Sequence, residues 1–201
     1  MNDQQLAIID SGGANLASLQ FALDRLDQAS VVTVDHSIIQ AAERVILPGV
    51  GAAKNAMQTL QRHGLDELIP ALEQPVLGIC LGMQLLFDRS EEDEVDCLGI
   101  IPGTASKLLA KKGLAVPNMG WSPIEVNYEH PLTDGLGADA WFYFVHSYAL
   151  PISSDTIASA AHGQRFTAVA GKDNFVATQF HPERSSSSGA RMLANFLGWR
   201  P

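Results

Sequence analysis

The chain has 201 residues, enough to bury the core of one larger-than-average domain. Apolar residues make up 46% and charged residues 17% of the chain, a balance that excludes a disordered protein, a collagen-like repeat and a coiled coil. Thirteen basic against 22 acidic residues give a formal net charge of −9, which argues against a nucleic acid or an anionic membrane surface as partner.

The cysteine count and residues 1–5 indicate in which cellular compartment the protein works. Two cysteines cannot build a disulfide framework, and no four-ligand zinc spacing is present, so we expect no metal. Residues 1–5 lack the basic region and apolar run of a signal peptide, and no stretch approaches the ~20 apolar residues that span a bilayer. We therefore expect a reduced, soluble, cytoplasmic protein.

Strands and helices alternate in the first half. Apolar runs at residues 6–9, 31–34, 45–47 and 75–79 predict strands, and helical spacing of apolar residues predicts helices over 16–26, through Met57 and Leu60, and over 81–87. Continuous apolar runs that end at glycine-rich turns and lead into helices are typical of a parallel sheet covered on both faces.

The second half is richer in short β-like pieces. These lie at residues 124–126, 141–145 and 167–169, and residues 189–197 predict a closing helix after the serine run 185–188. No linker separates the halves. We expect residues 1–201 to form a single α/β domain.

Cys80 occupies a turn with the pattern of a nucleophile elbow. In Gly78-Ile79-Cys80-Leu81-Gly82, a predicted strand ends at the cysteine and a predicted helix begins after it. The glycines permit a tight, strained turn that presents the thiol. The N-terminus of the following helix favours the thiolate form of Cys80. The backbone amide of Leu81 is placed to face a developing oxyanion. A lone cysteine is more often buried and inert, which fits Cys97, so a catalytic Cys80 needs a base.

His181 is the candidate base among six histidines. It lies in Gln179-Phe180-His181-Pro182-Glu183, after an apolar stretch, and a spacing of two puts His181 and Glu183 on one side of an extended segment. An imidazole that serves a cysteine needs a carboxylate to fix its tautomer. Alone, this segment would be a turn with a solvated carboxylate; together with the Cys80 elbow it predicts a catalytic triad.

Together, residues 78–84 and His181-Pro182-Glu183 resemble the class I (triad) glutamine amidotransferases. The resemblance implies the flavodoxin-like fold of that family, a mixed but mostly parallel central sheet flanked by helices, without a cofactor. It also implies roles for Cys80 as nucleophile, His181 as general base and acid, and Glu183 as the residue that orients His181.

The segment Leu47-Pro48-Gly49-Val50-Gly51 resembles, more narrowly, the glutaminase subunits of imidazole glycerol phosphate synthase. Glycines on both sides of Val50 permit a peptide flip that turns its amide toward the oxyanion. Residues 9–16, 98–103, 116–121 and 143–148 resemble further segments of that family, with departures at Ser11, Ala14, Asn118 and Arg184. The resemblance implies an oxyanion and glutamine site formed by Gly49, Val50, Gly51, Leu81, Gln84 and Ser147.

This resemblance also implies a partner. The chain would hydrolyse L-glutamine to glutamate and ammonia and pass the ammonia to a (βα)₈-barrel cyclase subunit, in a heterodimer that makes imidazole glycerol phosphate and aminoimidazole carboxamide ribotide for histidine biosynthesis. Candidate residues for the interface near the ammonia exit are Asn15, Met119, Trp121, Tyr143 and Arg184. For Trp121 and Tyr143, packing in the core is an equal alternative.

Three alternatives stay open from the sequence. The chain could be an amidotransferase that serves another acceptor, for instance a surface sugar. It could be a binding subunit with a vestigial triad, although the intact Cys80, His181 and Glu183 speak against that. It could also be a redox-sensing cysteine protein, which would not need residues 48–51 or 179–183.

Overall fold

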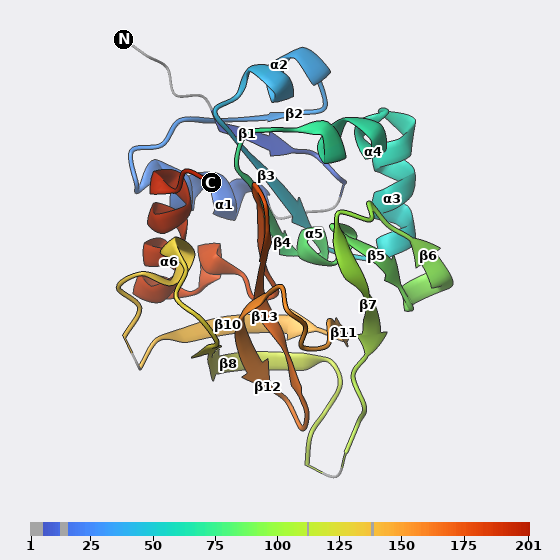
Figure 1. Cartoon of the computed structure of the whole chain (residues 1–201), viewed down its shortest axis with the longest axis vertical. Coiled ribbons are helices and arrows are strands. Elements are labelled where there is room, and N and C mark those ends of the chain that lie inside the picture. Colours follow the sequence, from blue (N-terminus) through green and yellow to red (C-terminus); the bar gives the residue numbers. More distant parts are fainter. Residues whose placement is uncertain (1–5, 13–15, 112, 138) are drawn as a thin grey trace.

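The computed structural model describes residues 6–12, 16–111, 113–137 and 139–201. Its centre is an eight-stranded sheet with the strand order β2-β1-β3-β4-β14-β13-β12-β9 (Figure 1). The first five strands in this order are parallel, and the last three run antiparallel to their neighbours. The strands are β1 (Leu6–Ile9), β2 (Ser30–Thr33), β3 (Arg44–Gly49), β4 (Val76–Cys80), β9 (Glu125–Val126), β12 (Thr156–Ala161), β13 (Arg165–Lys172) and β14 (Phe175–Thr178).

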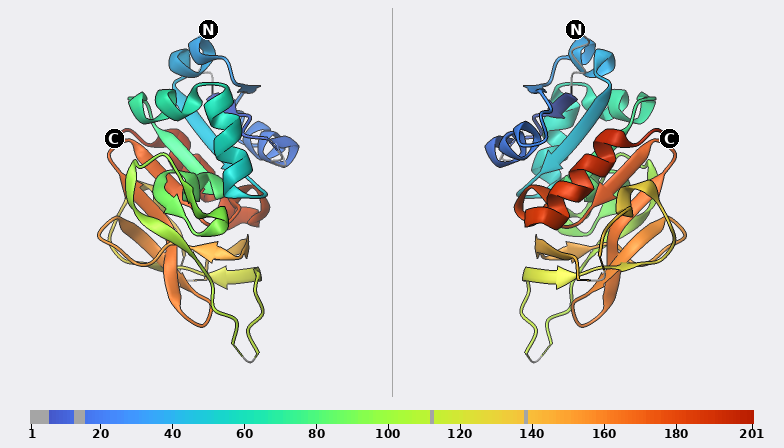
Figure 2. Two further views of the ribbon diagram at one scale, coloured as in Figure 1. Left: turned by 90° about the vertical axis from the view of Figure 1, so that its right-hand side faces the viewer. Right: turned by 90° about the vertical axis from the view of Figure 1, so that its left-hand side faces the viewer.

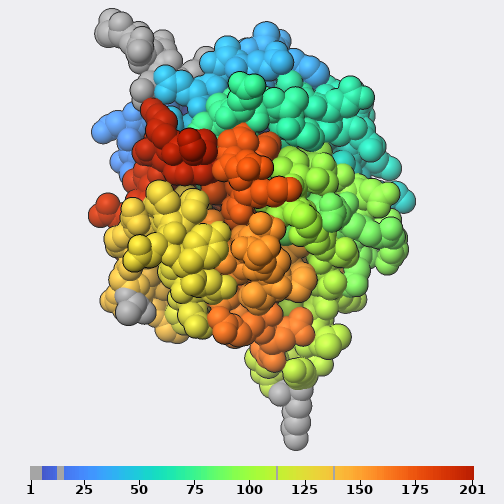
Figure 3. All heavy atoms as spheres, in the orientation of Figure 1, coloured from blue at the N-terminus to red at the C-terminus, as the bar shows by residue number. Residues whose placement is uncertain are grey.

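Helices cover both faces of this sheet, so that α3 is in front in one view of Figure 2 and α6 in the opposite view. On the face shown in Figure 3, α1 and the C-terminal helix α6 lie next to each other. The helices are α1 (Leu16–Asp24), α2 (His36–Ala41), α3 (Ala53–Arg62), α4 (Leu65–Leu68), α5 (Leu81–Leu85) and α6 (Ser186–Gly198).

Two hydrophobic clusters arise because successive side chains of a strand point to opposite faces. In β1, Leu6 and Ile8 join the cluster beneath α1 and α6, whereas Ala7 and Ile9 join the one beneath α2, α3 and α4. Arg44, at the start of β3, is 4% exposed and donates hydrogen bonds to the carbonyls of Phe196 and Trp199. These bonds tie the start of β3 to the carbonyls at the C-terminal end of α6.

Two smaller sheets lie beside the carboxyl ends of the parallel strands (Figure 1). One has the order β11-β7-β5-β6. The other is an antiparallel ribbon of β8 and β10, which we call the β8–β10 ribbon. Their strands are β5 (Phe87–Ser90), β6 (Val95–Asp96), β7 (Ile101–Lys107), β8 (Asn118–Pro123), β10 (Trp141–His146) and β11 (Tyr148–Ala149).

The structure confirms the α/β class and the parallel first half, with strands within one or two residues of the predicted runs. The predicted end of the helix over 81–87 is wrong: the helix ends at Leu85, and Phe87 begins β5. Residues 81–87 are all buried, so their side chains show no alternation that would mark the change from helix to strand. The closing helix also begins earlier than expected, at Ser186.

Candidate active site

The proposed catalytic residues meet because they follow neighbouring parallel strands. Gly49 ends β3 and pairs with Cys80 at the end of β4, while β14 pairs with β4 up to Thr178, three residues before His181. The carboxyl ends of parallel strands lie at one edge of a sheet, where α/β proteins bind their ligands. This edge therefore collects residues that are distant in sequence.

Cys80 sits on a strained turn, as predicted. Its φ of 55° and ψ of −110° are rare for a residue with a side chain, and α5 begins at the next residue. A Cβ on Gly82 would lie 1.8 Å from the carbonyl oxygen of Leu47, so only glycine allows α5 to pack this closely on β3. The elbow thus depends on contact between β3, β4 and α5.

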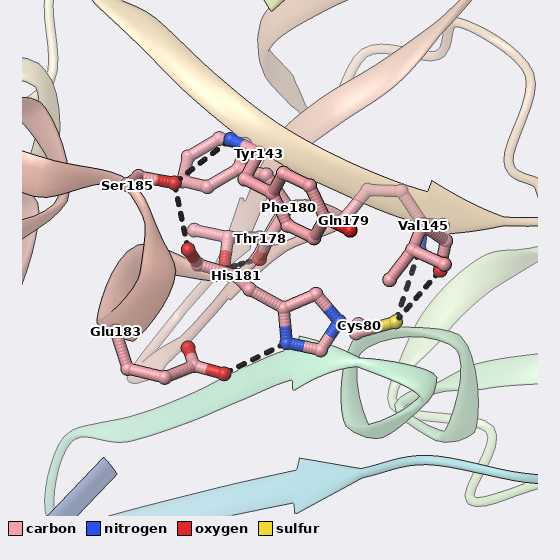
Figure 4. A network of polar contacts seen from close by, with 9 residues as sticks. All are labelled: Cys80, Tyr143, Val145, Thr178, Gln179, Phe180, His181, Glu183 and Ser185. Carbon is pink, nitrogen blue, oxygen red and sulfur yellow. Dashed lines mark hydrogen bonds and ion pairs between the residues drawn. The ribbon is translucent and has the colours of Figure 1, made fainter. Parts of the chain in front are cut away.

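His181 and Glu183 form a buried pair. Nδ1 of His181 lies 2.8 Å from Oε1 of Glu183, and both side chains are 8% exposed. The expected extended segment is wrong: Pro182–Arg184 form a 3₁₀ turn, and this turn brings Glu183 back to the ring. The backbone of His181 is held by Tyr143 and Ser185, which fixes the position of the ring (Figure 4).

The imidazole ring lies between Glu183 and the Cys80 thiol (Figure 4). Burial lowers the pKa of His181, but the interactions with Cys80 and with the Glu183 carboxylate outweigh it and raise the pKa to about 10. The site therefore favours a protonated imidazole next to the sulfur. Cys97 differs, because burial first and the charge of Asp96 second raise its pKa to about 11, as expected for an inert thiol.

A cavity of about 330 Å³ opens beside Cys80. This volume is at the lower end of the ~300–1,000 Å³ typical of sites for small molecules. Val50, Gly51, Leu81, Gln84 and Ser147 all line it, so five of the six residues expected around the oxyanion and the substrate come together here. The sixth, Gly49, packs on the backbone of Gly82 and lines a neighbouring cavity.

Several residues of the cavity were not predicted from the sequence. Glu92 contributes a half-buried carboxylate to the lining, where its Oε2 accepts a hydrogen bond from the backbone N–H of Ala53 at 2.9 Å. In the sequence it belongs to the acidic run 91–94, which has the pattern of a solvated segment. The remaining unpredicted lining residues are Pro117, Val145, His146 and Tyr148.

His146 is held neutral in the wall of the cavity. Burial is the main reason that its pKa falls to about 4. A neutral ring has one donor and one acceptor: Nδ1 donates to the carbonyl of Tyr148 at 2.8 Å, and Nε2 accepts from Nδ2 of Asn118 at 3.0 Å. Asn118, a departure from the family pattern, thus completes the hydrogen bonding of a buried histidine.

Three of the expected interface residues lie on the outer face of the β8–β10 ribbon. Met119 and Trp121 are 65% and 47% exposed, so Trp121 is not a core residue. Trp121 packs edge-on against Tyr143, and the guanidinium of Arg184 lies 4.9 Å from the centre of the Tyr143 ring. These four residues form one surface, whereas Asn15 lies outside the described residues.

A second cavity, of about 90 Å³, adjoins the first. The two share Val50, Val145 and His181, and the second extends to Glu183 and Arg184.

Within the described residues, no group of three or more histidine, cysteine, aspartate or glutamate side chains is placed to hold a metal ion. The same residues include no helix long and apolar enough to cross a membrane.

Comparison with known proteins agrees with this geometry. Residues 7–198 match the family described as glutamine amidotransferase class-I. The chain therefore belongs to the class-I glutamine amidotransferase family. Its sequence is 50% identical over 192 residues to the imidazole glycerol phosphate synthase subunit HisH of Xanthomonas campestris pv. campestris, and the aligned region covers 96% of each chain.

The HisH subunit of Vibrio cholerae serotype O1 is 47% identical over 200 residues, covering 96% of this chain and 98% of that one. Identity of this extent places the chain in the HisH branch of the family. Two solved structures share the fold at 16% identity: a glutamine amidotransferase with a TM-score of 0.72, and PurLQS from Thermotoga maritima with 0.70. In both comparisons the match covers 96% of this chain and 97% of the other.

Proposed function

We propose that the chain is the glutaminase subunit of an imidazole glycerol phosphate synthase and hydrolyses L-glutamine through a thioester on Cys80. One observation carries this proposal: the strained Cys80 turn faces the buried His181–Glu183 pair at the edge of a cavity of about 330 Å³. A nucleophile, a base and an orienting carboxylate in this order are what acyl transfer from an amide requires.

The Cys80 thiolate attacks the side-chain carboxamide of glutamine. The oxyanion of the tetrahedral intermediate accepts hydrogen bonds from the Leu81 amide and from the amide of Val50 or Gly51, each contributing ~3 kcal/mol to the barrier reduction. Protonated His181 gives its proton to the leaving nitrogen, and ammonia departs. Neutral His181 then takes a proton from water, which attacks the thioester and releases glutamate.

Gln84 and Glu92 provide the polar contacts that select an amino acid. Nε2 of Gln84 donates to the Tyr148 carbonyl and to Oε1 of Gln179, both at 3.0 Å, so its own Oε1 is the atom left to accept from a substrate. Glu92 supplies negative charge for the α-ammonium group. Backbone groups near Ser147 complete the site.

We propose the (βα)₈-barrel cyclase subunit as the partner, and Met119, Trp121, Tyr143 and Arg184 as part of the surface it covers. The exposed aromatic and basic side chains of this surface are of the kinds enriched at protein interfaces. Asn15 remains a candidate on the strength of the family resemblance. The small second cavity leads from His181 toward Arg184 and is our candidate for the ammonia exit.

Residues 1–201 would act as a single domain in the cytoplasm. A reducing compartment keeps thiols such as the free Cys80 and Cys97 from oxidation. With ammonia produced here and the acceptor bound by the partner, the assembled synthase would act as a lyase.

Glutamate release by Cys80→Ala, Cys97→Ala and the wild type tests the proposal, each with and without a cyclase subunit loaded with its nucleotide. We expect Cys80→Ala to be inactive throughout, and Cys97→Ala and the wild type to be weak alone and stimulated by the loaded partner. Glutamate release by Cys80→Ala would refute Cys80 as the nucleophile. Full activity of the isolated wild type would refute the dependence of glutamine hydrolysis on the loaded cyclase subunit.

A further inference from the structure

Gln179 is a fully buried side chain that directs its amide at the nucleophile. It follows β14 and precedes His181 by two residues, and it is 0% exposed. Its Nε2 lies 3.9 Å from Sγ of Cys80, and its Oε1 accepts a hydrogen bond from Nε2 of Gln84 at 3.0 Å. Figure 4 shows this amide and the Val145 carbonyl on the same side of the sulfur.

The orientation of the Gln179 amide is determined by a backbone carbonyl. The oxygen of Tyr148 can only accept, and it accepts from Gln84 Nε2 at 3.0 Å and from His146 Nδ1 at 2.8 Å. Gln84 therefore presents a nitrogen on this side, and Gln179 must turn its oxygen to that nitrogen. The Gln179 NH₂ group is left facing Cys80.

Besides His181, the sulfur has two polar neighbours, and they favour different protonation states of Cys80. The Val145 carbonyl, 3.8 Å from Sγ, can only accept, so it suits the thiol with its proton. The Gln179 amide nitrogen can only donate, so it suits the thiolate. A buried thiolate without donors would be strongly disfavoured, because Cys80 is only 7% exposed.

We propose that Gln179 donates a hydrogen bond to the Cys80 thiolate, which stabilises it and holds the sulfur in place for attack on the substrate. This inference rests on the proposed role of Cys80 as nucleophile. It adds a neutral donor to the electrostatic interaction between His181 and Cys80. It also links the nucleophile to Gln84, the residue proposed to contact glutamine. Cys80 thus depends on a side chain outside the triad.

The rate of alkylation by iodoacetamide, measured against pH without glutamine, tests this proposal. The thiolate forms a carbon–sulfur bond and iodide leaves, so the rate at each pH follows the thiolate fraction and needs neither the oxyanion site nor substrate binding. Mass spectrometry of peptides reports Cys80 and Cys97 separately in one sample. In the wild type we expect Cys80 to react faster than Cys97 at neutral pH.

Gln179→Met keeps the side chain long and buried but removes the donor. We expect the alkylation midpoint of Cys80 to rise by about one pH unit, a roughly tenfold loss of thiolate below the midpoint. Gln84→Met, which frees the Gln179 amide to turn, should give a smaller rise and serves as the second variant if Gln179→Met does not fold. Cys97 should be unchanged in every variant.

Thr178→Val is the matched control. It removes the buried hydrogen bond from Thr178 Oγ1 to the Phe180 carbonyl in the same segment, 3.1 Å long, and should leave the Cys80 profile unchanged. An unchanged midpoint in folded Gln179→Met, or a change only in the KM for glutamine, would overturn the proposal. A wild-type Cys80 that reacts no faster than Cys97 at neutral pH would instead refute Cys80 as the nucleophile.

Discussion

Replacing Glu183 by glutamine removes the charge beside His181 and keeps the shape of the side chain. Oε1 of Glu183 lies 2.8 Å from Nδ1 of His181, and both side chains are 8% exposed, so solvent screens this interaction little. A hydrogen bond to a charged group contributes ~1.5–3 kcal/mol, and one pKa unit corresponds to ~1.4 kcal/mol. We therefore expect the pKa of His181 to fall by about one to two units in Glu183→Gln.

The sign of the pH effect follows from the mechanism. His181 must be protonated to give a proton to the departing ammonia, so activity is present below its pKa and is lost as the pH rises through about 10. In Glu183→Gln this alkaline loss should move to lower pH by the same one to two units. Because the orienting charge is gone, kcat should also fall by about 10²- to 10⁴-fold.

The assay is steady-state glutamate release between pH 6 and 10.5. KM should change little, since Glu183 lines the second cavity and not the proposed glutamine site. Glu43→Gln removes the carboxylate of an ion pair with Arg44 far from the cavity and should behave as the wild type. A kcat for Glu183→Gln within about twofold of the wild type, with its alkaline limb unmoved, would show that the Glu183 charge does not set the protonation of His181.

Three further predictions follow from other contacts. Gly82→Ala should destabilise the protein by about 3 kcal/mol or more in denaturant unfolding, because its Cβ would meet the Leu47 carbonyl at 1.8 Å. Gly198→Ala, which has open space around it, should change the stability little. Equal stabilities of the two variants would contradict this steric explanation. Glu92→Gln should raise the KM for glutamine about tenfold with kcat nearly unchanged, and an unaltered KM would remove Glu92 from the substrate site. Trp121→Ala should weaken binding of the cyclase subunit by about 2 kcal/mol in titration calorimetry and leave the isolated chain stable; undiminished affinity would place the interface elsewhere.

The sequence reveals the elbow and the triad because their signals are local. Glycines on both sides of Cys80 are required by contacts within a few residues and by the approach of β3. His181 and Glu183 are two residues apart, so their pairing needed little knowledge of the fold. Even there, the backbone between them is a 3₁₀ turn and not the extended segment that the spacing suggested.

The rest of the site depends on long-range contacts that no local pattern reveals. Glu92 looks like one more charge in an acidic run, and only the fold of β5 and β6 brings it to the cavity. Gln84 and Gln179 are brought together by β4 and β14, which are distant in sequence and adjacent in the sheet. Trp121 could be assigned to the surface only when the register of the β8–β10 ribbon was known.

The proposed reaction begins with attack of Cys80 on the side chain of glutamine. The most direct measurement treats the protein with 6-diazo-5-oxo-L-norleucine, a glutamine analogue that alkylates the attacking nucleophile, and follows glutamate release and peptide masses together. We expect one equivalent to attach to Cys80, in step with the loss of activity, while Cys97 stays unmodified. Complete inactivation with Cys80 unmodified would show that another group attacks glutamine.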